Sequence, residues 1–343
     1  MYCFLRPVIC AGAILLTTLL QGNWNVLLAN DSAAEVAAGG IQLRKESRIS
    51  MEKERLTISL KKVTVEYEFL DTTDQDVTRE VAFPIPPYIW TPIDPAGTWD
   101  FSDFRVWVNG DEIRYQTDAR AKHNGTDCTH LLRQMGIDIQ NFGNVDKHEG
   151  KSQIDTLPDS ARRKLISLGL IEEGGNPYWT VILTYHWTQR FPAHKVLHVR
   201  HEYRPMVGTE WIEIAKIQQR FKDACIDSAL QQTLNTLASQ KLQEAKNSLY
   251  PTAPAISARW VKYILTTANT WKAPIRHFEL IVEEQEPDLN TQPLGKGMCW
   301  HGKVERSNTT RLVARKVNFI PTRELAVYYF SDYIEFKGKS ISK

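Results

Sequence analysis

Three of the nine histidines of the chain lie within eight residues, in the stretch HKVLHVRHEYRP. On a helix, His194, His198 and His201 would share one face and could bind a metal ion together. On a strand, side chains alternate between two faces, so His201 would point away from the other two. Prolines bracket the stretch, and apolar residues alternate with polar ones along it. The pattern therefore predicts a strand over residues 196–204, with His201 on its apolar side as a hydrogen-bonded core histidine.

The polar side of this strand leaves a second metal hypothesis open. His198 lies on that side, and His186 would point the same way on the preceding strand. These two side chains could share one ion, but a third ligand would have to come from elsewhere, and the spacing matches no zinc pattern. We therefore expect no metal at His186 and His198, and no motif in the sequence predicts a cofactor.

At two places in the chain a cysteine lies two residues before a histidine. On a strand, Cys299 and His301 would share a face, and a thiolate beside an imidazole is a nucleophile. Cys128 and His130 lie on a predicted helix, where residues two apart do not face each other. Cys299 with His301 is therefore the better candidate for a catalytic pair. A disulfide sulfur near a surface histidine is the favoured interpretation if the chain is exported.

The cysteine count fits one disulfide bond. Of five cysteines, Cys3 and Cys10 lie in the N-terminal segment that is expected to be removed on export, and Cys128, Cys225 and Cys299 remain. In an oxidising compartment these three would form one disulfide and leave one thiol, and the sequence does not determine which pair forms. We favour Cys225 with Cys299, because Cys128 lies in a segment that has the pattern of an insertion.

The first residues are typical of an export signal. Arg6 is the only charge before an apolar run, Val8–Leu20, which is shorter than the roughly 20 residues of a membrane helix. Ala29 is a small residue suited to cleavage, so we predict a signal peptide over residues 1–29 and a periplasmic or secreted mature chain without a transmembrane anchor. An uncleaved anchor is the alternative.

Net charge and composition indicate which kinds of molecule the protein is expected to bind. A formal net charge of +2 gives no long-range attraction to nucleic acid. The basic clusters ARRKL and RLVARKV are interpreted as solvated faces. The ten Trp, twelve Tyr and twelve Phe residues suit strands and extended binding surfaces alike. An envelope protein or a glycan is therefore the expected partner, and nucleic acid is not.

Alternating patterns predict a mainly β fold of sandwich-like antiparallel sheets with two helical insertions. The expected organisation after the signal peptide is an N-terminal β-domain over 30–118, a helical insertion over 119–176, and a C-terminal β-region over 177–343 with a helical segment at about 218–248.

Two local signals are specific. Asn109 and Gly110 are suited to the positive φ angles of a two-residue hairpin turn. At Lys61 and Lys62 the alternation of apolar residues changes phase, as it would at a β-bulge.

Three separated stretches resemble a bacterial family of exported proteins known only as domain of unknown function number forty-four twenty-four. They are NDSAAEVAAGGIQLRKESRISMEKERLTIS, VTVEYEFLDTTDQDVTREVAFPIPP and YILTTANTWKAPIRHFELIV. The resemblance covers most of the mature chain and implies periplasmic or secreted residence, without an established activity or catalytic residues. The stretch VAFPIPP followed by FRVWVNGDEI is more loosely similar to the vault/inter-alpha-trypsin type of β-domain, which is a likeness of fold only.

Two functional hypotheses remain at this point. The first is a non-enzymatic exported protein that binds or scaffolds an envelope component, protein or glycan. The second is an envelope hydrolase whose residues assemble only in three dimensions, with Cys299, His301 and the aromatic-flanked segment Trp271–Phe278 as its best candidates.

Overall fold

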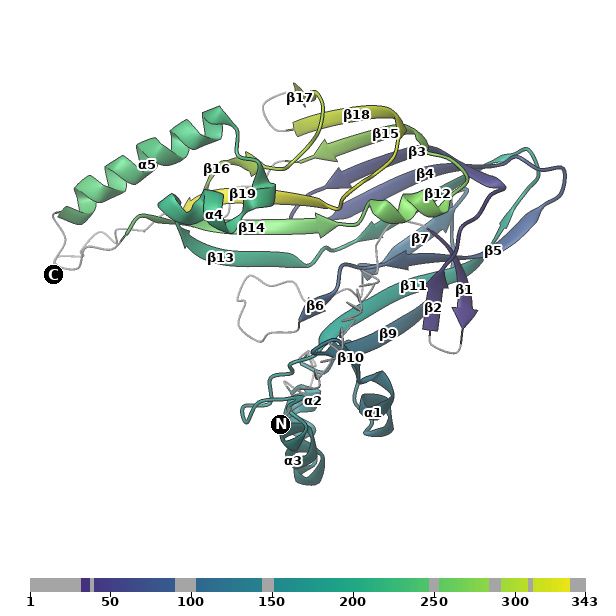
Figure 1. Cartoon of the computed structure of the whole chain (residues 1–343), viewed down its shortest axis with the longest axis horizontal. Coiled ribbons are helices and arrows are strands. Elements are labelled where there is room, and N and C mark those ends of the chain that lie inside the picture. The colour runs from purple at the N-terminus through teal and green to yellow at the C-terminus, as the bar shows by residue number, and fades with distance from the viewer. Residues whose placement is uncertain are drawn as a thin grey trace, which may run out of the picture.

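Three β-sheets form the body of the protein, and helices lie at its two ends (Figure 1). The computed structural model describes residues 32–37, 40–89, 103–143, 151–246, 253–283, 291–307 and 311–333. The predicted signal peptide lies outside these residues. The predicted mainly β fold with antiparallel sheets is confirmed.

The seven-stranded sheet joins distant parts of the first two thirds of the chain. Its strands are β1 (Ser32–Ala37), β2 (Gly40–Leu43), β5 (Val77–Pro84), β6 (Tyr88–Ile89), β9 (Gln116–His123), β10 (Thr126–Asp127) and β11 (Thr180–Phe191). They lie in the order β10-β9-β11-β5-β1-β2, and β6 pairs with β11 beyond the end of β5.

The eight-stranded sheet contains the histidine-rich stretch. Its strands are β3 (Ile49–Ile58), β4 (Val63–Asp71), β7 (Arg105–Val108), β8 (Asp111–Glu112), β12 (Val196–Tyr203), β15 (Ile275–Val282), β17 (Val304–Ser307) and β18 (Arg311–Phe319). They lie in the order β17-β18-β15-β3-β4-β12-β7-β8, with β3 and β15 parallel.

A four-stranded sheet completes the β structure. It contains β13 (Val207–Glu213), β14 (Ala255–Tyr263), β16 (Thr291–Gly297) and β19 (Leu325–Tyr333), in the order β13-β14-β19-β16. Buried residues from all three sheets form one continuous core. Its largest fully buried side chains include Phe69, Phe83, Trp179 and Trp271, and rings of this size contribute most of the apolar area that stabilises a fold.

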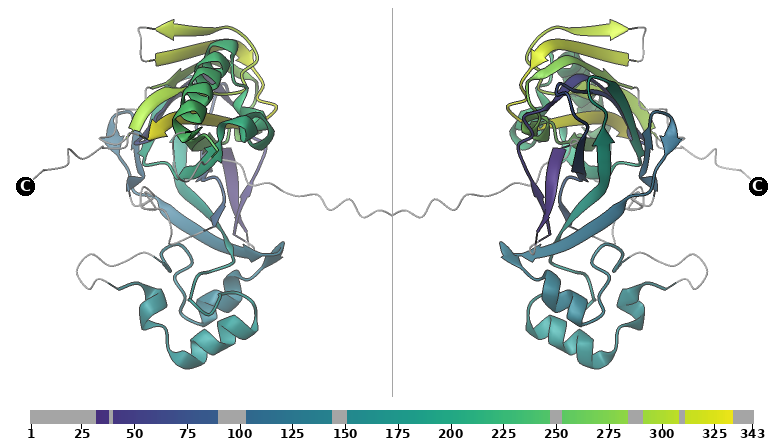
Figure 2. Two further views of the ribbon diagram at one scale, coloured as in Figure 1. Left: turned by 90° about the vertical axis from the view of Figure 1, so that its left-hand side faces the viewer. Right: turned by 90° about the vertical axis from the view of Figure 1, so that its right-hand side faces the viewer.

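The helices fall into two groups at opposite ends of the sheets. The first group is α1 (Thr129–Gln134), α2 (Gln153–Thr156) and α3 (Asp159–Ser167), which hang below the seven-stranded sheet in Figure 2. The second is η2 (Ile214–Lys216), α4 (Ile217–Arg220), η3 (Lys222–Ala224) and α5 (Ser228–Lys246), which pack on the four-stranded sheet. A short 3₁₀ helix, η4 (Thr266–Thr270), follows β14. The expected start of the helical insertion, at residue 119, lies inside β9.

The two specific sequence signals have different outcomes. Asn109 and Gly110 have φ angles of 50° and 96° and join β7 to β8, so the hairpin turn is confirmed. The predicted bulge at Lys61 and Lys62 is wrong, because the chain reverses there between β3 and β4. Ser59 is the reason: its N–H donates to the Lys62 carbonyl at 3.0 Å, and its Oγ accepts from the Lys62 N–H at 2.9 Å. A phase change in the alternation marked a tight turn that a serine side chain closes.

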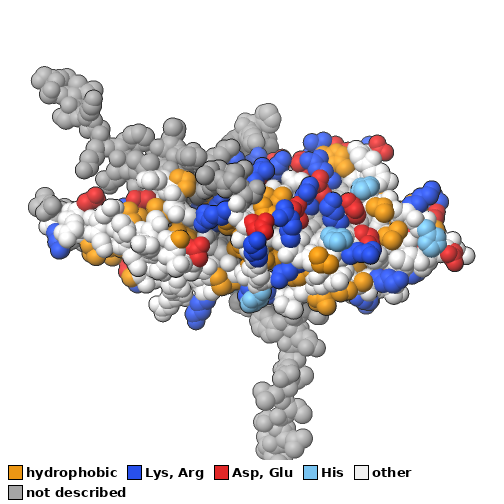
Figure 3. All heavy atoms as spheres, turned by 90° about the horizontal axis from the view of Figure 1, so that it is seen from above, with side chains coloured by type: hydrophobic (Ala, Val, Ile, Leu, Met, Phe, Trp, Pro, Cys, Tyr) orange, Lys and Arg blue, Asp and Glu red, His pale blue; other side chains and the backbone are white. Residues whose placement is uncertain are grey.

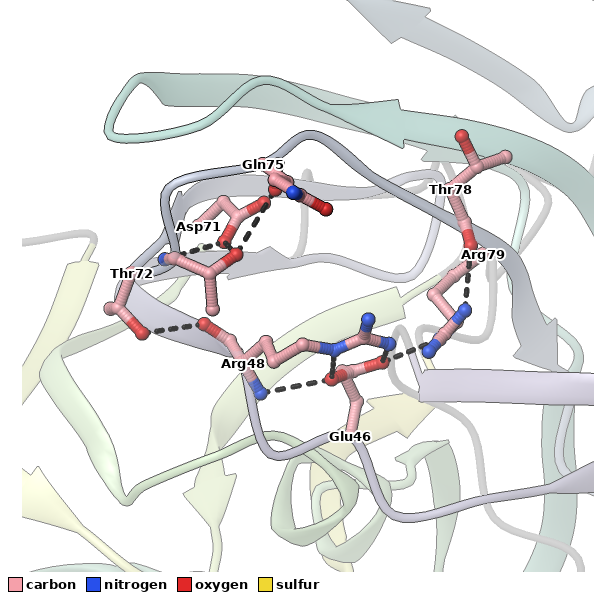
Figure 4. Close-up of polar contacts among 8 residues, drawn as sticks. Glu46, Arg48, Asp71, Thr72, Gln75, Thr78 and Arg79 are labelled. Atoms are coloured by element: carbon pink, nitrogen blue, oxygen red, sulfur yellow. Dashed lines mark hydrogen bonds and ion pairs between the residues drawn. The ribbon is translucent and has the colours of Figure 1, made fainter.

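A buried carboxylate joins the seven- and eight-stranded sheets (Figure 4). Glu46 is 3 % exposed and lies between β2 and β3. The N–H and Nε of Arg48 each donate to its Oε1 at 2.9 Å, and Nε of Arg79, on β5, donates to Oε2 at 2.5 Å. Burial alone would raise the pKa of Glu46, but the hydrogen bonds and charge of Arg48 outweigh it and lower the pKa below its ordinary value. The carboxylate therefore stays ionised and paired at this joint.

Candidate ligand-binding site

One histidine of the predicted strand is a core residue. His201 is fully buried on β12. Its ring contacts those of Phe83, Phe104, Trp187 and Tyr67, with centroids 4.8–5.5 Å apart. The strand over residues 196–204 is confirmed: it buries His201 and exposes His198, and His194 lies in the turn before it.

The structure does not bring His186 and His198 together. His186 lies on β11 in the seven-stranded sheet and His198 on β12 in the eight-stranded sheet. The intervening turn, in which His194 adopts a φ of 55°, carries the chain from one sheet to the other. His186 Nδ1 instead lies 2.5 Å from Glu80 Oε1. Within the described ranges there is no group of three or more His, Cys, Asp or Glu side chains that could hold a metal ion.

Of the three cysteines in the described residues, two form a disulfide bond and one is a buried free thiol. Cys225 and Cys299 are joined by a disulfide, with their Cα atoms 4.8 Å apart. Cys128 is buried and free, and burial raises the pKa of its thiol, whereas His130 points to solvent. Because the Cys299 sulfur is bonded to Cys225, it cannot form the thiolate that a Cys299–His301 catalytic pair requires.

The Trp271–Phe278 segment is not an aromatic surface. Trp271 is fully buried, and Phe278 is 2 % exposed. The exposed residues of the segment are Lys272–Pro274, Arg276 and His277, and none of them is a Trp, Tyr or Phe. The aromatic ends of this segment are core residues.

A hollow of about 250 Å³ lies beside the disulfide, at a corner between two sheets. Its walls are the loop 298–303, which connects β16 to β17, and the turn 319–325, which connects β18 to β19, together with Leu265 and Lys316. We call this hollow the disulfide pocket. The side chain of Arg323 holds the two walls together, because its Nη2 donates to the Cys299 carbonyl at 2.8 Å.

Aromatic rings form the apolar wall of the disulfide pocket. The rings of Trp300 and Phe319 lie 5.6 Å apart, and both pack on the core residue Phe278, at 5.7 and 4.9 Å. Leu265 and Leu325 are buried next to them, and Ile320 is 57 % exposed at the rim. An apolar wall of this kind stabilises a ligand that has an apolar body.

Two donors of the disulfide pocket have no acceptor within the described chain. Nε1 of Trp300 is shielded from solvent without a hydrogen-bond partner, and the ammonium of Lys316 makes neither a hydrogen bond nor an ion pair with a described residue. Buried donors are paired in the great majority of cases, so an unpaired one needs an explanation. A Cβ atom on Gly302 would lie 2.7 Å from Lys316 Nζ and 3.9 Å from Trp300 Nε1, which places both donors around one point.

One carboxylate also lines the disulfide pocket. Glu324 Oε2 accepts from the Leu265 N–H at 2.8 Å, and its Oε1 accepts from the Thr266 hydroxyl at 2.7 Å. This side chain therefore caps the start of η4 and is not paired with Lys316. Arg323 is engaged with a carbonyl and not with a carboxylate. The pocket combines apolar walls with two cationic side chains, Lys316 and Arg323, that form no ion pair with a described residue.

Comparison with known proteins places the chain in a family. The model of the family described as Domain of unknown function (DUF4424) matches residues 29–328. The chain belongs to this family. None of the curated proteins compared with the sequence matches it. Among the residues that the structure describes, no helix is both long and apolar enough to cross a bilayer.

Several solved structures resemble the chain distantly. A proposed nutrient-binding protein from Legionella pneumophila is 14 % identical, with a TM-score of 0.37 over 89 % of this chain and 72 % of that one. An M1 zinc metallopeptidase from Deinococcus radiodurans and the yeast LTA4 hydrolase are 5 % and 6 % identical, each with a TM-score of 0.25. The matches cover 84 % and 83 % of this chain but only 44 % and 29 % of those enzymes. At these scores the likenesses carry no argument about function.

The outer face of the eight-stranded sheet is a second polar region. A single row of side chains crosses the sheet from β18 to β8 by direct cross-strand pairing. The row, which we call the charged row, consists of Arg315, Glu279, Arg55, Glu66, Arg200, Trp107 and Glu112. Positive and negative side chains interleave in the same way on the face seen from above in Figure 3.

Each charge of the row has an opposite charge or a ring beside it. The carboxylate of Glu279 accepts hydrogen bonds from Nε of Arg55 at 2.6 Å and from Nε of Arg315 at 2.8 Å. Nη1 of Arg55 lies 3.9 Å from the Glu66 carboxylate. Burial alone would raise the pKa of Glu279, but the hydrogen bonds from Arg55 and Arg315 outweigh it and lower the pKa. The charged side chains at this end of the charged row are therefore paired with one another.

At the other end of the charged row, two arginines lie over one indole. The guanidinium carbons of Arg105 and Arg200 are each 4.7 Å from the Trp107 ring centroid. Arg105 also donates to Glu112 at 2.9 Å, and Arg200 pairs with Glu202. A hollow of about 370 Å³ lies here and includes His198, but its cations are already engaged. The charged row is therefore a solvated sheet face stabilised by its own pairs.

The two donors of the disulfide pocket had signals in the sequence. Lys316 belongs to the basic cluster RLVARKV, which we interpreted as a solvated face. Because neighbours on a strand point to opposite sides, Arg315 and Lys316 cannot both belong to that face. Trp300 lies between Cys299 and His301, two residues whose chemistry gives a stronger signal in the sequence. Strand alternation would have identified Lys316, whereas the approach of the loop 298–303 to β18 has no sequence signal.

Proposed function

We propose that this protein is an exported binding protein that holds a small anionic ligand with an apolar body in the disulfide pocket. One observation carries the proposal: Lys316 and Trp300 line the same apolar hollow, and neither the Lys316 ammonium nor the Trp300 N–H has an acceptor in the described chain. A carboxylate or phosphate bound there would accept from both donors, and hydrogen bonds to charged groups contribute about 1.5–3 kcal/mol.

The size of the disulfide pocket favours a small ligand. Ligand pockets commonly enclose about 300–1,000 Å³, and this hollow, at about 250 Å³, is below that range. A short-chain or single-ring acid would place its apolar part against Phe319 and Leu325. Burying apolar surface contributes about 25 cal/mol per Å², so the rings add affinity and the cations select for charge.

Binding is favoured over catalysis by the state of two of the reactive groups in the disulfide pocket, Cys299 and Glu324. Cys299 is bonded to Cys225, and Glu324 is occupied by donors at the start of η4. Neither side chain is then available as a nucleophile or general base. Export is supported by the apolar run Val8–Leu20 and by a disulfide that oxidising compartments favour. A protein or glycan partner of the envelope remains compatible with a small-ligand site.

Calorimetric titration of the mature chain, starting at Asn30, tests the proposal. The probes are hexanoate and benzoate, with hexanol and benzyl alcohol as uncharged counterparts of the same shape. We expect the acids to bind at least about tenfold more tightly than the alcohols, the equivalent of about 1.4 kcal/mol for one charge-assisted hydrogen bond.

Three variants locate the site. Lys316→Met should lower affinity for the acids about tenfold or more, and Trp300→Phe, which keeps the ring and removes the N–H, should lower it several-fold. Lys164→Met removes an exposed lysine of α3 and should change nothing. Equal affinity of wild type and Lys316→Met for both acids, or the absence of binding to either, would contradict the proposal.

A further inference from the structure

The longest strand of the seven-stranded sheet is paired on only part of one edge. β11 pairs with β5 as far as Phe191, opposite Val77. On its other edge it pairs with β9 only as far as His186, opposite Gln116. The segment Trp187–Phe191 therefore has a described strand on one side alone. An unpaired strand edge presents main-chain donors and acceptors to any chain that can lie beside it.

The direction of these main-chain groups follows from one hydrogen bond. The Leu183 carbonyl accepts from the Ile85 N–H at 2.8 Å, so its main-chain groups face the β5 and β6 side. In an antiparallel strand, the N–H and C=O of one residue point to the same side, and this side alternates from each residue to the next. The N–H and C=O groups of Thr188 and Arg190 therefore face the opposite, open side of β11. The Arg190 carbonyl accepts from Nε2 of its neighbour Gln189 at 2.7 Å. The N–H and C=O of Thr188 and the N–H of Arg190 are left for a strand partner.

A hollow of about 560 Å³ lies beside this open edge, between β11 and the chain that follows the β7–β8 hairpin. Val108, Ile113 and Leu197 contribute apolar side chains to it. Trp187 also lines it, is 4 % exposed, and has an Nε1 donor without a hydrogen-bond partner in the described chain. We call this hollow and the open edge the β11 notch.

We infer that the β11 notch binds an extended peptide segment of another protein, which adds to β11 as a strand. Main-chain groups at strand spacing match the backbone of an extended peptide, and the apolar lining receives alternate side chains. The open segment spans about 14 Å, enough for a strand of about four or five residues. This inference is independent of the small-ligand site, which lies on other elements.

Charge at the β11 notch refines the kind of peptide. Arg114 and Asp111 line it, both are exposed, and neither forms an ion pair with a described residue. Two other polar side chains at the notch already have partners: His186 Nδ1 lies against Glu80, and Arg190 forms an ion pair with Asp76. The unpaired charges are one positive and one negative, so the matching peptide alternates apolar and polar residues and carries both an acidic and a basic side chain.

Selection from a phage library of random peptides of about eight residues on the mature protein provides the probe. Binding is then measured to wild type, Thr188→Pro and Thr188→Val. Proline removes the N–H that faces the notch without removing a bond to β5, and an edge position tolerates it. Valine keeps the N–H but loses the hydroxyl that donates to Glu80 at 3.0 Å. We expect at least about tenfold weaker binding to Thr188→Pro and little change for Thr188→Val.

A second measurement leaves the protein unchanged and so does not depend on the folding of a variant. The selected peptide is synthesised with N-methyl groups on its odd-numbered or on its even-numbered amides. Strand addition uses one edge of the peptide, so one methylated form should lose at least about tenfold in affinity and the other should keep it. The amides of Thr188 and Arg190 should gain protection from hydrogen exchange when the peptide binds.

Three outcomes would overturn the inference. The first is that no selected peptide binds Thr188→Pro more weakly than wild type. The second is that both methylated forms of the peptide bind equally well. The third is that the wild-type protein is a dimer, which Thr188→Pro converts to a monomer. The last would identify a second copy of the chain, and not a peptide, as the occupant of the β11 notch.

Discussion

The charged row and the disulfide pocket both include residues of β18. The cations of the charged row have partners, whereas the Lys316 ammonium in the pocket has none in the described chain. On β18, Arg315 points outward and donates to Glu279, whereas its neighbour Lys316 lines the pocket without a described partner. The arginine belongs to a surface whose charges neutralise one another. The lysine lines a pocket whose one described carboxylate, Glu324, is engaged at the start of η4 instead.

This difference separates residues that stabilise the fold from residues that are available to a ligand. A cation that already has a carboxylate must give it up before it can bind another anion. A cation without one has no such cost, and its contribution to folding is correspondingly small. The number of charged residues in a hollow is therefore a poorer guide to binding than the number that remain unpaired.

The largest expected effect concerns the bond that holds one wall of the disulfide pocket. Replacing Cys225 and Cys299 together by serine opens a loop of 74 residues, which should cost about 2–4 kcal/mol of unfolding free energy. Urea denaturation followed by circular dichroism measures the loss. The variant should also lose affinity for hexanoate, because the loop 298–303 is no longer tied to η3. An unchanged denaturation midpoint and affinity would show that the pocket does not depend on this bond.

A smaller effect is expected in the charged row. Glu279→Gln weakens the pairs with Arg55 and Arg315 and should cost about 1 kcal/mol at pH 7. The pKa of Glu279 is lowered in the folded state, so its contribution is fully present above the ordinary value of 4.5 and is lost as the pH falls through the folded-state value. Denaturation at pH 7 and pH 3 should therefore show wild type and variant converging in acid. A difference that stays constant with pH would contradict this account of the charged row.

The smallest expected effect is also the most direct test of the contrast. Arg315→Met and Lys316→Met remove neighbouring cations from the same strand. The first should destabilise the protein by about 0.5–1 kcal/mol, because Glu279 loses a partner, and the second should change stability by less than about 0.5 kcal/mol. Parallel urea titrations decide between them. A loss above about 1 kcal/mol in Lys316→Met would mean that its ammonium has a stabilising partner, and the contrast between the two regions would fail.

The local structure could be predicted where a short stretch determines its own conformation. Alternation over residues 196–204 predicted β12 and placed His201 in the core, and Asn109 with Gly110 predicted the turn between β7 and β8. The helical segment predicted at about 218–248 contains α5, in which Leu230 and Leu234 are buried. Each of these rests on interactions between residues close in sequence.

Arrangements that depend on distant segments were not predictable in the same way. His186 and His198 lie on consecutive strands, and a hairpin would have placed them side by side. The chain instead passes from one sheet to another between them, a choice made by the whole core and not by the turn. The disulfide pocket likewise requires the loop 298–303 to contact the turn 319–325. The predicted pairing of Cys225 with Cys299 indicated that this loop lies near residue 225, but not that it contacts the turn.

One missing side chain sets the position of the charge in the disulfide pocket. Gly302 has a φ of 128°, and the space where its Cβ would stand lies 2.7 Å from the Lys316 nitrogen. A single methyl group there would displace the ammonium from the indole edge while leaving both residues in place. If the pocket binds acids as proposed, a substitution at Gly302 would lower its selectivity for them without removing Lys316 or Trp300.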